Sequence, residues 1–96
     1  MEAIAELIKR RRLQLLVHSC IYYEFNENII DDHEFDRRAK ELVELQEKYP
    51  EIAEKVEWAD AFAGFDGSSG YHLPYRNPWV MKTAKRLLRA HGKVVD

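Results

Sequence analysis

The sequence contains a single cysteine, Cys20, and no apolar run as long as a membrane-spanning helix. One cysteine excludes an intrachain disulfide and a zinc site built from several cysteines. A spanning helix needs ~20 consecutive, mostly apolar residues, so we expect no membrane segment. The first residues lack the basic start and apolar run of a secretory signal. This predicts a cytoplasmic protein whose true start is Met1.

Length and composition are those of one globular domain. The chain has 96 residues, of which 46% are hydrophobic and 33% are charged. These values are typical of a folded chain with a modest core rather than of a disordered one. Residues 1–96 are therefore interpreted as a single domain, without internal repeats or low-complexity tracts.

Charge is distributed unevenly, although the formal net charge is only -2. Residues 31–60 carry eleven acidic and five basic side chains, whereas residues 76–96 carry six basic side chains and one acid, Asp96. Such a dipole either steers an anionic partner to the basic segment or docks the two segments on each other. Charge runs most often mark a solvated face, so docking within the fold or mere solvation is favoured, and an anionic partner is the alternative.

Hydrophobic periodicity predicts a long first helix over residues 2 to about 25, which contain no glycine or proline. One stripe of this helix is formed by Ile4, Ile8, Leu15 and Tyr22. Further apolar residues cover most of the circumference of its second half. We therefore expect it to be the central helix, in contact with more than one neighbouring element.

Two further helices have clear boundary signals. Asp31 followed by Glu34 has the acid-first form of a capping box and starts a second helix, which Pro50 ends. Asn77 as N-cap opens a third helix that stops at Gly92. The predicted buried stripes are Phe35, Ala39, Leu42 and Val43 in the second helix and Val80, Ala84, Leu87 and Leu88 in the third.

The predicted fold class is all-α. It comprises an antiparallel helical hairpin over residues 2–52, a loop region over residues 53–76 and a C-terminal helix over residues 77–92. Residues 51–62 carry a weak signal for a short helical turn. The loop holds three glycines and runs into the aromatic segment 71–75. It lacks the lysine and spacing of a P-loop, and we expect it to pack on the helices.

Aromatic and acidic side chains come together at the turn between the first two helices. Tyr22 and Tyr23 fall near the end of the first helix, and Asp32, Phe35 and Asp36 share one face of the next. Aromatic faces for stacking and carboxylates for hydrogen bonds suit a planar cationic ring such as nicotinamide. The alternative is that the tyrosine and phenylalanine rings are core residues, because aromatic stripes at helical spacing usually are.

This segment resembles the N-terminal Ia domain of NAD-dependent DNA ligases. The resemblance covers roughly residues 5 to 52, about half of the chain, and several separated elements agree. They are Tyr22-Tyr23, the run from Ile30 to Arg38, Glu41-Leu42 through Leu45, and Tyr49-Pro50-Glu51.

In that family the domain recognises the nicotinamide mononucleotide (NMN) half of NAD and orients the pyrophosphate for attack by a lysine of a separate adenylation domain. The resemblance implies that Tyr22 stacks on the nicotinamide, and that Asp32 and Asp36 accept hydrogen bonds from its amide or ribose. NAD or NMN is thus the implied cofactor.

The chain departs from the family pattern at three positions. Phe35 stands where the family usually has tyrosine, which keeps a stacking face and loses a hydroxyl. Tyr23 stands where some members have histidine, and Asn28 replaces a proline common in the turn. Ligand affinity, or the ligand itself, is therefore expected to differ.

The chemistry of ligation requires a Lys-x-Asp-Gly nucleophile motif, and the chain's Asp-Gly pair, Asp66-Gly67, is not preceded by Lys-x. The first hypothesis is therefore a stand-alone NMN-recognising module, of phage or mobile-element origin, that is not an enzyme alone and supplies its half-site to a separate adenylation domain. An NAD-cleaving enzyme is the least supported hypothesis, because no nucleophile or general base stands out beyond the site carboxylates.

A second hypothesis is an interaction or regulatory protein that reuses the hairpin to bind a host or replication protein, or DNA. In that case the pocket is vestigial and nucleic-acid phosphates contact the basic face of the third helix, formed by Lys82, Lys85, Arg86 and Arg89. By contrast, the four consecutive basic residues 9–12 are distributed around the circumference of their helix and do not form a stripe.

The remaining reactive side chains indicate no further site. The four histidines lack metal-ligand spacing, so no metal is assigned. Cys20 lacks an obvious basic activator and is interpreted as a small buried residue.

Overall fold

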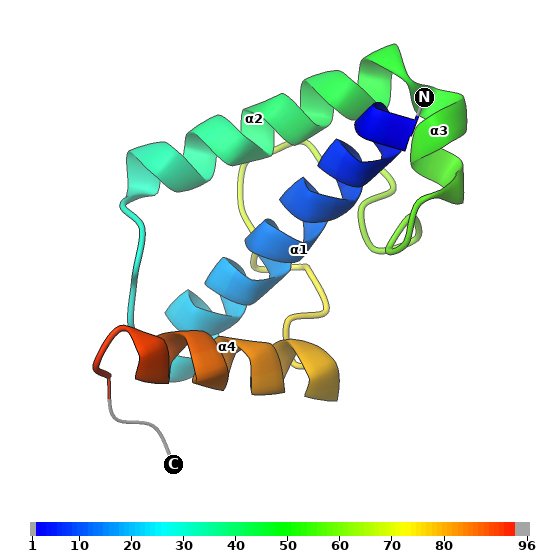
Figure 1. Cartoon of the computed structure of the whole chain (residues 1–96). Helices are drawn as coiled ribbons and strands as arrows, with labels where there is room; N and C mark the ends of the chain where they lie inside the picture. The colour runs from blue at the N-terminus through cyan, green and yellow to red at the C-terminus, as the bar shows by residue number, and fades with distance from the viewer. Residues whose placement is uncertain (1, 94–96) are drawn as a thin grey trace.

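Four helices make up the regular structure of residues 2–93, the part of the chain that the computed structural model describes (Figure 1). They are α1 (Glu2–Phe25), α2 (Asp32–Lys48), α3 (Pro50–Lys55) and α4 (Pro78–Ala90). The described range contains no strand, which confirms the all-α prediction and its hairpin. Met1, predicted to be the true start, and Asp96 of the basic segment lie outside this range. No helix in it is long and apolar enough to cross a membrane.

Helix α1 is central, as predicted, and packs against α2, α3 and α4. Figure 1 shows α2 returning alongside α1 to form the hairpin, with α4 crossing the C-terminal end of α1 and α3 near its N-terminal end. Burial follows from this arrangement, because a helix with neighbours on several sides buries most of its circumference. Its buried apolar side chains are Ile8, Leu15, Leu16, Val17, Cys20 and Ile21.

The boundaries of α2 and α4 follow local capping chemistry. The Asp31 carboxylate accepts the backbone N–H of Glu34 at 2.8 Å, which satisfies an otherwise unpaired donor of the first turn of α2. Pro50 cannot continue α2 and instead occupies the first position of α3. The Asn77 side chain accepts the N–H of Trp79 at 2.9 Å at the start of α4. The predicted helix starts are therefore confirmed.

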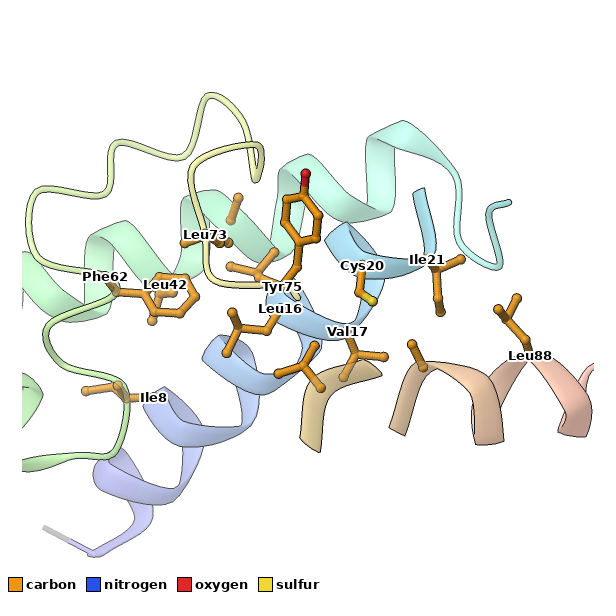
Figure 2. Close-up of a cluster of buried hydrophobic side chains, with 14 of the residues drawn as sticks. Ile8, Leu16, Val17, Cys20, Ile21, Leu42, Phe62, Leu73, Tyr75 and Leu88 are labelled. Atoms are coloured by element: carbon orange, nitrogen blue, oxygen red, sulfur yellow. The ribbon is translucent and has the colours of Figure 1, made fainter. Parts of the chain in front are cut away.

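The predicted apolar stripes are confirmed at most positions and wrong at one. Figure 2 shows Val17, Cys20 and Ile21 of α1 facing α4, and Val80, Ala84 and Leu88 of α4 are buried there, whereas Leu87 is half-buried. Ala39 and Leu42 of α2 are buried, and Phe35 and Val43 are half-buried. Tyr22 falls on the predicted buried stripe of α1, but it is 53% exposed, because it lines the open cavity at the end of α1.

The long connection between α3 and α4 packs on the helices, as expected of a segment rich in aromatic residues. Phe62, Leu73 and Tyr75 are buried and belong to the same core as Ile8 and Leu42 (Figure 2). This connection therefore contributes side chains to the same core as the helices.

The buried guanidinium of Arg12, which the sequence analysis did not single out, ties this connection to the hairpin. The side chain is 2% exposed, and burial lowers its pKa. Its Nε and Nη2 donate to the Gln46 side-chain oxygen at 3.1 and 2.8 Å. The remaining N–H groups donate to the backbone carbonyls of Ala53, Val56 and Glu57. One side chain of α1 thus holds α2 and the end of α3.

Arg12→Ala is expected to lower the free energy of unfolding by about 3 kcal/mol, because it leaves buried carbonyl oxygens without donors. The measurement is urea unfolding followed by circular dichroism at 222 nm. Arg10→Ala is the matched control, since Arg10 lies on the same helix and is exposed. Equal stability of the two variants would contradict the structural role of Arg12.

Candidate functional site

A cavity of about 310 Å³ lies where the end of α1, the following turn, the start of α2 and the glycine-rich loop meet. All five predicted site residues line it, namely Tyr22, Tyr23, Asp32, Phe35 and Asp36. The lining also includes His18, Ser19 and the loop residues Ser68, Ser69 and Gly70, which are not among the predicted site residues. The structure therefore brings together the predicted cluster and a loop far from it in sequence.

The two tyrosines at the end of α1 have different surroundings. Tyr23 stacks on buried Tyr75 with ring centroids 5.5 Å apart, and its hydroxyl lies 3.1 Å from Ser69 Oγ. Tyr22 meets Tyr23 edge to face at 4.9 Å and is more than half exposed. Tyr23 is thus a wall held by the loop, whereas Tyr22 keeps an aromatic surface available to a ligand.

The acidic side chains at the start of α2 are also divided by their partners. The Glu34 carboxylate accepts hydrogen bonds from Arg37 and Arg38. These bonds, of which the one from Arg37 contributes most, lower the pKa of the carboxyl to about 2. Asp32 and Asp36 are exposed, and no ion pair joins either to a cation within residues 2–93. These two carboxylates, one helical turn apart, give the cavity a negative rim.

The glycine-rich loop closes the cavity through Gly70, which is buried against α1 and α2. A Cβ at this position would overlap Ser19 Oγ, and it would lie 2.9 Å from Ser19 Cβ and 3.3 Å from Phe35 Cζ. The third glycine of the loop is therefore required by a close approach of backbone to helix. At the loop's other end, Asp66 accepts the N–H and the hydroxyl of Ser68 at 2.9 and 2.7 Å, forming a local turn.

Two polar atoms of α1 lie beside the cavity without a hydrogen-bond partner among residues 2–93. Ser19 is 1% exposed and its hydroxyl makes no hydrogen bond, and neither does buried His18 Nδ1. Burial, with smaller contributions from Arg38 and His91, lowers the pKa of His18 to about 4. Helical spacing could have identified both, because they precede Tyr22 and Tyr23 by four residues and so share their face.

The basic side chains predicted on the C-terminal helix do not reach this cavity. Lys82, Arg86 and Arg89 are exposed on α4, and Lys85 is half-buried near Cys20. They form a separate surface of the molecule.

Cys20 is fully buried, as predicted, and its thiol lies 3.3 Å from the sulfur of Met81. Burial and, next, Glu24 raise the pKa of the thiol to about 11, so it is protonated at neutral pH. No group of three or more candidate metal ligands is found among the residues that the structure describes.

The fold and the cavity define an all-α module with a small acidic, aromatic-walled pocket at the turn of a helical hairpin. Residues 1–55 match the model of the family described as DNA ligase-like, N-terminal NAD+-binding domain. The match covers more than half of the chain. The chain belongs to this family.

Curated DNA ligases are similar to the same part of the chain. The DNA ligase of Pseudothermotoga lettingae is 41% identical over 51 residues, which are 53% of this chain and 8% of that protein. The DNA ligase of Thermoanaerobacter sp. is 43% identical over 47 residues, 49% of this chain and 7% of that protein. The matched segment therefore spans less than a tenth of these relatives. No solved structure matches the chain at a significant level.

Gly70→Ala is expected to lower the free energy of unfolding by about 2 kcal/mol, because the added methyl group overlaps Ser19 in a packed site. Ser19→Ala in the same chain is expected to restore part of this loss by removing the overlapping oxygen. Thermal unfolding is measured for the wild type, the two single variants and the double variant, and the four values form a double-mutant cycle. If the two substitutions change the free energy of unfolding additively, the close contact between Gly70 and Ser19 is contradicted.

His18 is expected to make the fold less stable as pH falls. The neutral imidazole persists in the native state down to about pH 4, whereas the unfolded chain takes up the proton near its usual pKa of 6.5. Protonation thus favours the unfolded state, and stability present above pH 6.5 is lost between about pH 6.5 and 4.

Between pH 7 and 4.5 the wild type is expected to lose about 2 kcal/mol more than His18→Gln does. Urea unfolding at both pH values measures this difference, and His72→Gln, at an exposed histidine, is the control. Parallel losses in the wild type and His18→Gln would show that His18 is not the group responsible.

Proposed function

We propose that this chain recognises the nicotinamide mononucleotide half of NAD through Tyr22, Asp32, Phe35 and Asp36, with Tyr23 as the wall of the site. The supporting observation is that all five side chains, from two helices, line one cavity whose Tyr22 ring is exposed. A core role would have buried this ring. The family's NAD+-binding description supports the same ligand class.

The charge of the cavity fits the nicotinamide ring, which is cationic in NAD and NMN. Asp32 and Asp36 provide negative charge and hydrogen-bond acceptors at the rim, and Tyr22 provides a π face for the cation. A volume of about 310 Å³ is at the lower end of the size range of small-molecule sites. The site thus suits one planar ring and its ribose better than a whole dinucleotide.

Two buried polar atoms beside the cavity, Ser19 Oγ and His18 Nδ1, also support a polar ligand. Phe35 offers no hydroxyl, whereas Ser19 Oγ and His18 Nδ1 are buried beside the cavity without partners. Buried polar groups usually have hydrogen-bond partners, and a carboxamide can donate and accept at once. In this proposal they assist carboxamide recognition, with His18 as a neutral imidazole.

The proposed role is binding and orientation, not bond formation by this chain alone. The sequence has no Lys-x-Asp-Gly motif, so the nucleophile that attacks the NAD pyrophosphate would come from a separate adenylation domain. The residues described here would then hold the leaving nicotinamide nucleotide. A site shared between two domains explains why this cavity has hydrogen-bond acceptors and an aromatic face but no activated nucleophile.

An NMR titration with NMN, NAD and then AMP tests the proposal. NMN and NAD are expected to shift the aromatic signals of Tyr22 and Phe35, whereas AMP leaves them in place. Asp32→Asn is expected to weaken NMN binding tenfold or more, because a charged acceptor is lost. Phe35→Tyr is expected to tighten it by supplying a hydroxyl.

Asp60→Asn is the matched control, because Asp60 is an exposed carboxylate outside the cavity lining. It should bind NMN as the wild type does. If millimolar NMN moves neither aromatic signal in the folded wild type, the proposed ligand is wrong.

A further inference from the structure

The outward face of α4 combines an exposed indole with exposed cations. Trp79 is 50% exposed, and Lys82, Arg86 and Arg89 are exposed as well. At 100° per residue these four positions fall within one quarter of the helix circumference, opposite Val80, Ala84 and Leu88 in the core. We refer to these four residues as the α4 outer face.

No acidic side chain among residues 2–93 forms an ion pair with this face. The sequence has no aspartate or glutamate between Asp66 and Asp96. Within residues 2–93, some cations have carboxylate partners, such as Arg76 with Glu24 and Lys93 with Glu27, but the three cations of the α4 outer face have none. The internal docking of acidic and basic segments, left open by the sequence, therefore does not account for these cations.

The spacing along the helix fits a flexible polyanion. A rise of ~1.5 Å per residue places the four side chains along ~15 Å, with the indole at one end and the cations following it. An exposed aromatic ring offers a stacking surface to a nucleobase, and cations in line with it contact successive phosphates. A paired duplex does not offer a free base face to a side chain on its surface.

We propose that the α4 outer face binds single-stranded nucleic acid, with Trp79 stacking on a base and Lys82, Arg86 and Arg89 contacting phosphates. This face lies outside residues 1–55, which match the ligase family, and outside the cavity lining. The proposal is therefore independent of nicotinamide recognition. It assigns the C-terminal helix a role in recruitment to nucleic acid.

Fluorescence anisotropy with a labelled oligo(dT) strand and with a duplex of the same length tests the proposal on the full chain. We expect preference for the single strand, with a slope of log affinity against log salt of about -2, from three phosphate contacts at ~0.7 each. Trp79→Ala is expected to weaken single-strand binding about fivefold or more. Its effect on any duplex binding should be small.

The charge test uses Lys82→Glu/Arg86→Glu and the matched control Lys40→Glu/Lys55→Glu. The control cations are exposed on α2 and α3, neither of which contacts α4, and both double variants change the net charge equally. Only the α4 variant should abolish binding, and circular dichroism verifies that each variant is folded. Any of three results overturns the proposal: no oligo(dT) binding at low salt, equal losses in both double variants, or duplex preference that Trp79→Ala leaves unchanged.

Discussion

The guanidinium of Arg12 is the interaction on which the arrangement of this small protein depends. It lies in the core between α1, Gln46 of α2 and the carbonyl groups at the end of α3, and all of its N–H groups have acceptors. Gln46 in turn donates to the carbonyl of Phe62, which extends the network into the loop. A buried charge is tolerated only with such complete hydrogen bonding, so the network specifies one position for the chain after α2.

The position of the connection between α3 and α4 determines whether the cavity exists. From Phe62 the connection runs to Gly70, whose backbone approaches Ser19 too closely for a side chain, and then to Tyr75, which stacks on Tyr23. The hairpin alone supplies the tyrosines and carboxylates, but it leaves the cavity open on the loop side. Family membership rests on the hairpin, whereas part of the cavity wall comes from residues beyond the match.

The two proposed surfaces of the molecule are also separated by charge. Exposed carboxylates lie at the start of α2, and exposed cations lie on α4. Both helices pack on α1 but not on each other. A cationic ring and a polyanion would therefore be attracted to different places on one chain, and neither site would neutralise the other.

The sequence by itself determined the helices and the candidate residues, because capping side chains, proline and apolar periodicity act within a few residues of each other. Asp31, Pro50 and Asn77 set helix boundaries where they were predicted, and the spacing of Asp32 and Asp36 placed both on one face. Apolar periodicity also predicted most of the buried positions, and only the tertiary structure decided the exceptions. It left Tyr22 exposed and buried Arg12 and Ser19, because these outcomes depend on the packing of the connection between α3 and α4. That connection carries no periodic signal, and its path is fixed by contacts with residues dozens of positions away.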